Sequence, residues 1–483
     1  MSKISFRVND QTRVLLSDML PYETPLIFSN HGFFRVVNSY KNSALPDAVN
    51  TFVEDYVICK DLHSFVPFSY RSNKPNGDKL TLSVLHQGAQ YRFIQFYSNY
   101  DSLIVSLCTK SSFSIRYPRS PHGKFVFEET ADIDPPRRGD PVDIEGDEVK
   151  IEKMYPNSYF VYGGYTFLYK FFESPEFVSL ERRYKVFHSF DISKCFYNIY
   201  THSLSWMVKD KEFAKSNRSK FTFENEFDRL MQTANYKETN GIPVGPEVSR
   251  IFAEVIFQEV DRRVEERLFQ EGLRLGEHYT VRRYVDDHFV FGVNEDVARK
   301  VGQSFEEELE KVKLYVHDQK TEWACLPFMS GRSFAKREAG EILRNFWESV
   351  FTEEKRGKNL VYTPVELFSP RRMAKNIIQD LKKACFNGEI EFNEICSRVI
   401  FDLFTRVRRR FHSQYVDRSS KKYGESIGKI FEVVLEIASY MLLIGPRVQT
   451  IIGYANLILE LRRESSRAPD HIKEYIDNRI LEE

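Results

Sequence analysis

The chain has little cysteine and no long apolar run, and each shortage excludes a class of protein. Six cysteines are scattered through 483 residues, and none of them forms a C-x-x-C pair. That scatter argues against a zinc site or a disulfide framework and fits a reducing compartment. No apolar stretch approaches the ~20 residues that span a membrane, and the N-terminus has no long apolar core of the kind that signal peptides carry. We therefore expect a soluble cytoplasmic protein without a membrane partner.

The chain also lacks a net charge, because its 69 basic residues are balanced by 69 acidic ones. The overall charge gives no sign of a nucleic-acid partner, and a chain that binds one would have to gather its basic residues locally. Aromatic residues are abundant instead, with 41 phenylalanines and 26 tyrosines, which suit both core packing and base stacking. The length and the apolar content predict a large core divided over two or three domains.

Two adjacent acids, Asp286 and Asp287, interrupt a run of residues that favour strands. The pair lies within His278–Val293, with apolar and aromatic residues that suit strands on both sides, so the pattern predicts a β-hairpin with the acids at its tip. Two carboxylates placed together form a hard-oxygen site suited to Mg²⁺. Aspartate is also common in turns because it tolerates their backbone dihedral angles. A third acid elsewhere is therefore needed to favour a metal site.

Three other blocks flank this hairpin in the sequence. A short strand-like run, Phe187–Phe190, ends at Asp191, which supplies the third acid. A turn rich in glycine and proline, Asn240–Pro246, opens into an amphipathic helix. After the hairpin, a helix with charged faces over about 296–313 leads to the segment Leu314–Thr321.

In this order and spacing the four blocks resemble motifs A, B, C and D in the palm of reverse transcriptases. The resemblance implies an α+β protein with the polymerase right-hand fold, in which reverse-transcriptase fingers and palm precede an all-α C-terminal domain. It also implies the enzyme class, an RNA-directed DNA polymerase or DNA nucleotidyltransferase that takes dNTPs and releases a DNA product.

The expected domain boundaries follow the motifs and the changes in composition. Residues 1–70 form an N-terminal extension, and residues 71–185 form the fingers. The fingers contain an insertion loop near 128–148, where nine acids accompany two arginines. Residues 186–334 form the palm. In residues 335–483 the apolar spacing predicts five or six packed helices, which would make a thumb-like domain.

The three acids are the candidate catalytic groups and metal ligands. Two divalent ions ~3.5–4 Å apart can stabilise the attacking and leaving oxygens of a nucleotidyl transfer, and Asp191, Asp286 and Asp287 could bridge such a pair. In the family the backbone carbonyl after the motif-A acid is a further ligand, which by resemblance is that of Ile192 here. The implied cofactor is Mg²⁺ or Mn²⁺. Repulsion among the carboxylates would be costly without these ions.

The resemblance also implies residues that contact the nucleotide. Phe196 matches the position under the sugar, where a bulky ring collides with a 2′-hydroxyl and favours dNTPs. Gly245 would let the backbone approach the nucleotide closely. Lys320, after motif D, would act at the leaving pyrophosphate as a proton donor or a fixed charge. The alternatives without a function are that Phe196 is an ordinary core residue and Lys320 an ordinary surface residue.

A Pro-Asn-Gly turn resembles the fingers hairpin that grips the incoming triphosphate. Lys74 and Lys79 flank this turn, and Arg92 matches the next fingers element. Two positions depart from the family pattern, because Leu80 stands where an arginine is usual and Val244 where motif B often has glutamine. These departures weaken the expectation of conventional triphosphate and template handling.

The amino-acid sequences of motifs A and B resemble those of the bacterial defence-associated and abortive-infection (Abi-like) reverse transcriptases. The b subunits of type 3 defence-associated systems resemble it most, and the Abi polymerases come next. The resemblance implies antiphage defence by DNA synthesis in the bacterial cytoplasm, and oligomerisation. For the type 3 systems it implies a non-coding RNA and a second reverse transcriptase as partners. For the Abi polymerases it implies synthesis without a nucleic-acid template, primed from a protein hydroxyl.

Two other interpretations stay open. One is an RNA-templated reverse transcriptase of the retron or group II intron type, against which the neutral charge and Val244 argue. The other is a polymerase-fold module that binds nucleic acid without catalysis. The presence of all three carboxylates argues against that second interpretation.

Overall fold

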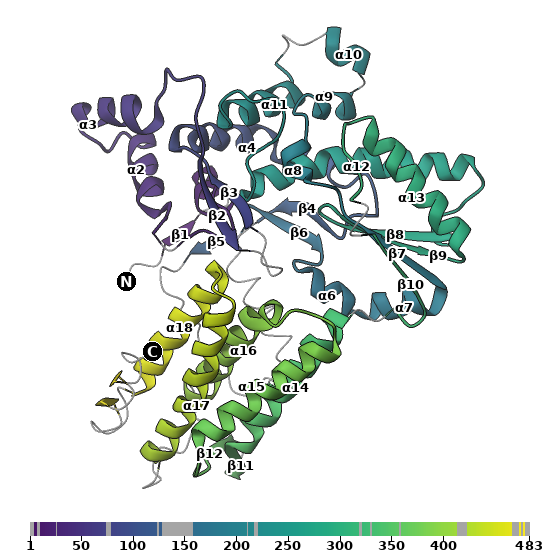
Figure 1. Cartoon of the computed structure of the whole chain (residues 1–483). Helices are drawn as coiled ribbons and strands as arrows, with labels where there is room; N and C mark the ends of the chain where they lie inside the picture. Colours follow the sequence, from purple (N-terminus) through teal and green to yellow (C-terminus); the bar gives the residue numbers. More distant parts are fainter. Residues whose placement is uncertain are drawn as a thin grey trace. The chain divides into compact units, whose positions relative to one another are not determined.

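The computed structural model of the chain divides into two compact units (Figure 1). Unit 1 holds the described residues of Met1–Tyr70, Thr81–Asp132 and Pro141–Phe328, and unit 2 those of Arg71–Leu80 and Met329–Glu483. The structure describes all residues except 1–3, 7–9, 26, 74–78, 123–124, 128–157, 210, 217–220, 318–320, 329–330, 357–358, 413–422, 466–472, 475–476 and 479–483.

The N-terminal segment of unit 1 shares the main core of the unit. Val14, Met19 and Phe33 are buried in one cluster with Phe93 and Phe252, which come from much later in the chain. The N-terminal extension is therefore part of the packed body of this unit. Its elements are β1 (Ile4–Phe6), the 3₁₀ turn η1 (Gln11–Arg13), α1 (Val14–Ser17), α2 (His31–Lys41), α3 (Asp47–Phe52) and the π-helical turn η2 (Val53–Ile58).

A long helix and several short two-stranded sheets follow. The helix, α4, buries Phe93, Phe96 and Tyr97. It begins after His86, whose ring accepts a hydrogen bond from the Gly88 amide. The elements are β2 (Phe68–Asn73), β3 (Lys79–Val84), α4 (Gln87–Leu107), β4 (Arg116–Pro121), β5 (Phe125–Phe127) and β6 (Phe160–Gly164). In these sheets β2 pairs with β3, β1 with β5, and β4 with β6.

The centre of unit 1 is a four-stranded antiparallel sheet in the order β10-β7-β9-β8. Side chains alternate between the two faces of this sheet, and both faces are packed against other residues. Phe190 and His288 meet Phe305 on one side, whereas Phe187 and Phe289 join an aromatic cluster on the other. The strands are β7 (Val186–Phe190), β8 (Tyr279–Tyr284), β9 (Asp287–Gly292) and β10 (Glu322–Cys325).

Helices surround this sheet and complete the core. The longest of them, α12, is buried along most of its length, as expected for a helix with apolar residues on all sides, such as Ile251, Phe252, Ala253 and Phe257. The helices are α6 (Leu168–Phe172), α7 (Pro175–Arg183), α8 (Cys195–Asn198), α9 (Ser203–Val208), α10 (Lys211–Ser216), α11 (Phe223–Ala234), α12 (Glu247–Gln270) and α13 (Glu295–Glu310).

Unit 2 is mostly helical, as the sequence predicts. Its core holds residues such as Trp347, Leu381, Leu403, Phe431 and Leu457, one from each of its helices. One hairpin was not predicted, and its strands pair over six residue positions after a helix that ends at Ser349. The elements are α14 (Gly331–Ser349), β11 (Phe351–Arg356), β12 (Asn359–Pro364), α15 (Pro370–Asn387), α16 (Asn393–His412), α17 (Tyr423–Ile444) and α18 (Val448–Ser465).

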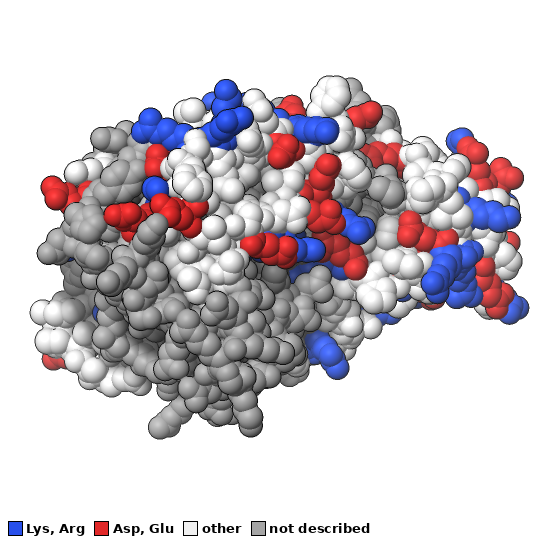
Figure 2. Space-filling view, turned by 90° about the horizontal axis from the view of Figure 1, so that it is seen from below, with Lys and Arg blue, Asp and Glu red and all other residues white. Residues whose placement is uncertain are grey.

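Two surface properties bear on the expected environment. Among the described residues, no helix is long and apolar enough to cross a membrane. On the face drawn in Figure 2, the coloured acidic and basic residues lie close to one another, and neither sign dominates that face. The local mixing of charge agrees with the balanced composition. The acidic insertion loop expected near 128–148 lies outside the described residues.

Candidate active site

The predicted hairpin is present and places two acids at its turn. β8 and β9 are antiparallel, and Tyr284 pairs with Asp287, which leaves Val285 and Asp286 as a two-residue loop. Val285 has a φ of 58°, in the left-handed region that β-branched residues avoid. The first position of a tight hairpin turn of the II′ kind demands such a φ, and glycine is its usual occupant. The turn is therefore strained just before the acids.

The third acid lies beside this turn. The β7–β9 register pairs Phe190 with His288, and one further step would set Asp191 opposite Asp287. Facing residues of an antiparallel pair point to the same side of the sheet. Electrostatics agrees with this closeness, because burial first, and then the negative charges of Asp286 and Asp191, raise the pKa of the Cys195 thiol well above its usual range. The negative charges of motifs A and C are thus both close enough to Cys195 to affect its pKa.

The backbone around Ile192 is paired along one edge with the segment 315–317. The amide of Ser193 donates to the Tyr315 carbonyl over 2.8 Å, and the amide of His317 donates to the Asp191 carbonyl over 2.8 Å. Ile192 lies between these bonds and bridges Val316. Because the Asp191 carbonyl is turned toward this segment and successive carbonyls of a strand point in opposite directions, that of Ile192 points away from Val316 and is not used in this pairing.

The residues fit a hard divalent cation by type, since they offer carboxylates and a backbone carbonyl. Within the described part of the chain, however, no group of three or more His, Cys, Asp or Glu side chains is arranged as a ready metal cage. The assignment of Asp191, Ile192, Asp286 and Asp287 as metal ligands therefore stays a prediction.

Buried side chains hold the strands of the hairpin. His288 is fully buried, and its Nδ1 lies 3.0 Å from the Asp286 carbonyl. Burial, and then the nearby Arg283 charge, lower the pKa of His288 to about 3. The imidazole is therefore neutral at physiological pH, and its Nδ1–H donates to the carbonyl. The ring stacks on Phe190, the residue before Asp191, with 4.8 Å between ring centroids.

The motif-B loop is packed against the N-terminal segment. Gly245 has a φ of 117°, and a Cβ there would lie 2.7 Å from the Pro21 Cβ and 3.2 Å from a Leu82 methyl carbon. The Val244 carbonyl accepts a hydrogen bond of 2.9 Å from the Ser83 amide. The structure thus gives the glycine a reason in protein packing, beside the close approach to a nucleotide that the sequence suggests.

Phe196 lies on α8, one turn after Asp191. Its carbonyl accepts a hydrogen bond of 2.9 Å from the Ile242 amide, so α8 is attached to the motif-B turn. The ring is partly buried and packs against the main core. Phe196 is thus positioned between motifs A and B, whereas its role under a sugar stays a prediction.

The predicted triphosphate residues are placed differently from one another. Arg92 lies on α4, where its guanidinium donates to the Leu62 carbonyl and stacks 4.8 Å from the centroid of the Phe65 ring. Lys79 begins β3, is exposed and is counted with unit 2. Lys74 and Lys320 lie outside the described residues.

Sequence reasoning missed a buried charge cluster at the start of α12. Glu247 accepts hydrogen bonds from Arg116 (2.8 Å), Arg250 (2.9 Å) and the Tyr162 hydroxyl. Burial alone would raise the pKa of Glu247, but the two guanidinium groups hold it at about 2. The signal in the sequence was weak, since an acid in the first turn of a helix is common for its effect on the helix dipole alone.

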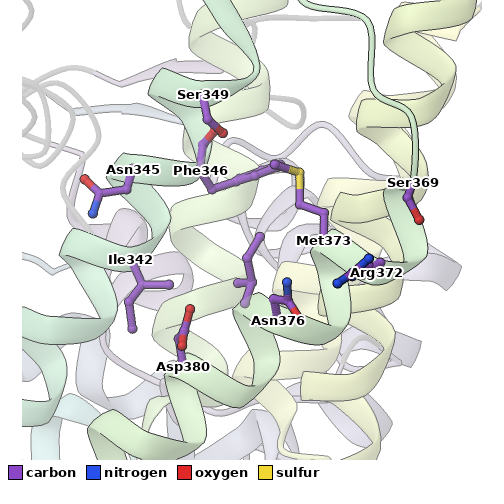
Figure 3. Close-up of a pocket in the computed structure, with 10 residues that line it drawn as sticks. Ile342, Asn345, Phe346, Ser349, Ser369, Arg372, Met373, Asn376 and Asp380 are labelled. Atoms are coloured by element: carbon purple, nitrogen blue, oxygen red, sulfur yellow. The ribbon is translucent and has the colours of Figure 1, made fainter.

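A separate pocket of about 470 Å³ lies in unit 2, between α14 and α15 (Figure 3). Its lining combines apolar side chains, such as Phe346 and Met373, with the charged Arg372 and Asp380. None of the predicted site residues lines it.

Comparison with known proteins gives the class of this site. Residues 150–363, less than half of the chain, match the family described as "Reverse transcriptase (RNA-dependent DNA polymerase)". The span contains Asp191, Asp286 and Asp287. The chain therefore carries a reverse-transcriptase domain of the polymerase right-hand fold, and its enzyme class is RNA-directed DNA polymerase. Domains of this class generally use divalent metal ions.

Solved structures give a distant likeness. The apo telomerase from Candida tropicalis is similar over 93% of this chain and 74% of its own, with 10% identity and a TM-score of 0.35. The telomerase from Candida albicans, in complex with a TWJ fragment of telomeric RNA, is similar over 93% and 71%, with 9% identity and a TM-score of 0.35. No curated protein matches the chain.

Proposed function

We propose that the chain polymerises dNTPs into DNA by two-metal nucleotidyl transfer at Asp191, Asp286 and Asp287. The observation that supports this most is the register of β7 against β9, since one step beyond the Phe190–His288 pair would set Asp191 opposite Asp287, beside the turn that carries Asp286. In nucleotidyl transfer of this kind, hard divalent cations bind between such carboxylates and the reacting oxygens. We propose Mg²⁺, with Mn²⁺ as the alternative.

Bound metal ions would stabilise negative charge on the attacking 3′-oxygen and on the leaving pyrophosphate. The part of the chain is to hold the carboxylates and the Ile192 carbonyl toward one point. Asp286 and Asp287 are held by the hairpin, whereas Asp191 and Ile192 are held by β7 and by the bridge to Val316. Positioning of this kind, made before the substrate arrives, is what lowers a barrier.

The nucleotide pocket follows from the neighbours of this site. Phe196 would lie under the sugar, and Gly245 would face the base. Lys320 would place a proton or a fixed charge at the leaving pyrophosphate. Lys74, Lys79 and Arg92 are the proposed contacts to the triphosphate. For Arg92 this would require release from the Leu62 carbonyl that it now binds.

The finer biological role rests on the resemblance of motifs A and B to bacterial defence enzymes. We propose antiphage defence in the bacterial cytoplasm, by synthesis that needs no conventional template and is primed from a protein hydroxyl. The proposed partners are a non-coding RNA, a second reverse transcriptase and further copies of the chain. The departures at Leu80 and Val244 support the part of this proposal that concerns the template.

The experiment that tests the proposed activity is incorporation of labelled nucleotides by the purified full chain. Each dNTP and each NTP is offered separately and together, with Mg²⁺, with Mn²⁺ and with EDTA. We expect deoxynucleotide incorporation that EDTA abolishes. Incorporation that survives EDTA, or its absence with every metal and nucleotide in the presence of co-purified nucleic acid, would contradict the proposal.

A further inference from the structure

Arg283, the residue two positions before the turn, is fully buried, and its guanidinium donates to two acids and a backbone carbonyl. Its Nε and Nη2 donate to an Asp261 oxygen over 2.9 and 2.8 Å, and its Nη1 and Nη2 donate to Glu254 over 2.8 and 3.2 Å. Both acids lie on α12. The guanidinium therefore attaches β8 to the central helix of the unit by bidentate pairs, which fix orientation as well as distance.

One further contact reaches the turn itself. Nη1 of Arg283 donates to the Val285 carbonyl over 3.0 Å. This carbonyl belongs to the residue with the strained φ of 58° and is bonded directly to the Asp286 amide. A conformation of that kind persists only where its surroundings hold it, and the guanidinium is the buried donor that does so.

The two carbonyls of the turn are thus held by one buried side chain from each strand. Arg283 on β8 holds the Val285 carbonyl, and His288 on β9 holds that of Asp286. The backbone of Arg283 is itself fixed, because its amide donates to the Phe113 carbonyl over 2.7 Å and its carbonyl accepts from the Ile115 amide over 2.8 Å. The direction of the turn is therefore set from the interior of the protein.

We propose that Arg283 is a positioning residue for the candidate metal carboxylates, because it holds the Val285 turn that carries Asp286 and Asp287 and anchors that turn to α12. This inference rests on the proposed function and adds a residue to it. Without the Val285 contact, Arg283 would be no more than an ion pair inside the core. The two roles differ in what a substitution changes.

The test compares Arg283→Lys with Arg282→Lys in the full chain. Lysine keeps the charge but has a single nitrogen and no planar fork, so it cannot form bidentate pairs with both acids while it also holds the carbonyl. Arg282 is the matched control, because it lies on the same strand and pairs with Glu176 over 2.6 Å, away from the turn. A second variant, Asp261→Asn, keeps the guanidinium and weakens only its anchor, so it covers the case in which Arg283→Lys does not fold.

Three readouts separate positioning from mere stability. For Arg283→Lys and Asp261→Asn we expect amide hydrogen exchange in the peptide 279–292 to rise at least tenfold, and the Mn²⁺ concentration that half-saturates binding, followed by electron paramagnetic resonance, to rise severalfold. The turnover rate should fall at least tenfold, while the KM for dNTPs changes less than twofold. Arg282→Lys should leave all three near wild type.

The proposal is overturned if folded Arg283→Lys or Asp261→Asn protein exchanges and binds Mn²⁺ as the wild type does, or if Arg282→Lys produces the same changes. A failure of the proposed function shows itself differently. In that case the wild type has no incorporation that depends on Asp286, whereas the hydrogen-exchange comparison still reports whether Arg283 holds the turn.

Discussion

Gly245 shows at the scale of one residue how backbone conformation and packing combine. Its φ of 117° is strained for any L side chain, and the space where a Cβ would stand is filled by Pro21. Gly245→Ala should therefore destabilise unit 1 by more than the ~1–3 kcal/mol of backbone strain alone. Calorimetry of the full chain measures the change.

The matched control for this prediction is Gly272→Ala. Gly272 also has a positive φ, 85°, but nothing lies within 4 Å of the site of its Cβ. It should therefore show the backbone cost alone. Equal losses of stability in the two variants would remove Pro21 from the explanation.

Phe196 carries the second prediction at this scale. If its ring lies under the sugar, Phe196→Ala opens room for a 2′-hydroxyl and should raise the use of ribonucleotides relative to deoxynucleotides. The expected change is about 10- to 100-fold, which corresponds to ~1–3 kcal/mol of discrimination in a pocket. Competitive incorporation of paired dNTP and NTP gives the ratio. An unchanged ratio in a folded variant would place Phe196 in the core only.

At the scale of elements, the N-terminal segment and α12 are joined at a buried acid. The Asp18 side chain accepts from the Tyr159 amide over 2.7 Å and from the Tyr97 hydroxyl over 3.0 Å, and its carbonyl accepts from the Glu247 amide over 3.0 Å. Burial first, and then the charge of Glu247, raise the pKa of Asp18 from 3.8 to about 7. The folded state therefore holds a proton that the unfolded state releases.

This sign gives a pH dependence. Stability from the protonated Asp18 is fully present below pH 3.8 and is lost as the pH rises toward about 7. Asp18→Asn should remove that loss, so the variant should unfold at a higher temperature than the wild type at pH 8, and the gap should close toward pH 4. At pH 8 the corresponding difference in the free energy of unfolding is a few kcal/mol, at ~1.4 kcal/mol per pKa unit.

Unfolding temperatures between pH 4 and pH 8 test this prediction. Asp61→Asn, at an exposed turn, serves as the control and should leave the profile unchanged. A gap between Asp18→Asn and the wild type that grows toward low pH would contradict the account.

The same elements show what the sequence could reveal. The hairpin was predictable because strand-forming residues flank Asp286 and Asp287 and no other short structure suits that pattern. The contact of Arg283 with Asp261 was not, since the two residues lie on separate elements and an arginine in a strand is usually a surface charge. The hydrogen bond between Ser83 and Val244 was hidden for the same reason.

At the scale of the whole molecule, apolar spacing predicted a helical C-terminal region and the family resemblance implied an α+β fold, and the structure has both. The N-terminal segment was expected as an extension, yet Val14 and Met19 are in the main core. No periodicity in the sequence marks such short helices, because their burial depends on partners distant in the chain. The hairpin β11–β12 was missed for a related reason, since it interrupts a region of strong helical spacing.

The whole-molecule prediction concerns the template. Leu80 and Val244 both remove groups that usually handle the triphosphate and the template pair, so bases would be selected by the protein's own polar groups. An unpaired polar group in such a pocket costs ~1–3 kcal/mol, enough to bias incorporation by roughly tenfold per base. We expect a product of restricted composition. Extension with all four dNTPs and unrelated RNA templates, followed by sequencing, tests this, and faithful complements of those RNAs would contradict it.

The central claim is that Asp191, Asp286 and Asp287 form one metal-dependent site for DNA synthesis. The measurement that tests it most directly is the initial rate of dNTP incorporation by Asp191→Asn, Asp286→Asn and Asp287→Asn, beside Asp61→Asn, with the unfolding temperature of each. We predict that each of the three palm variants loses ~100-fold or more of the rate while it unfolds no earlier than the wild type, since relief of carboxylate repulsion costs no stability. Near-normal incorporation by folded Asp286→Asn protein would contradict the account.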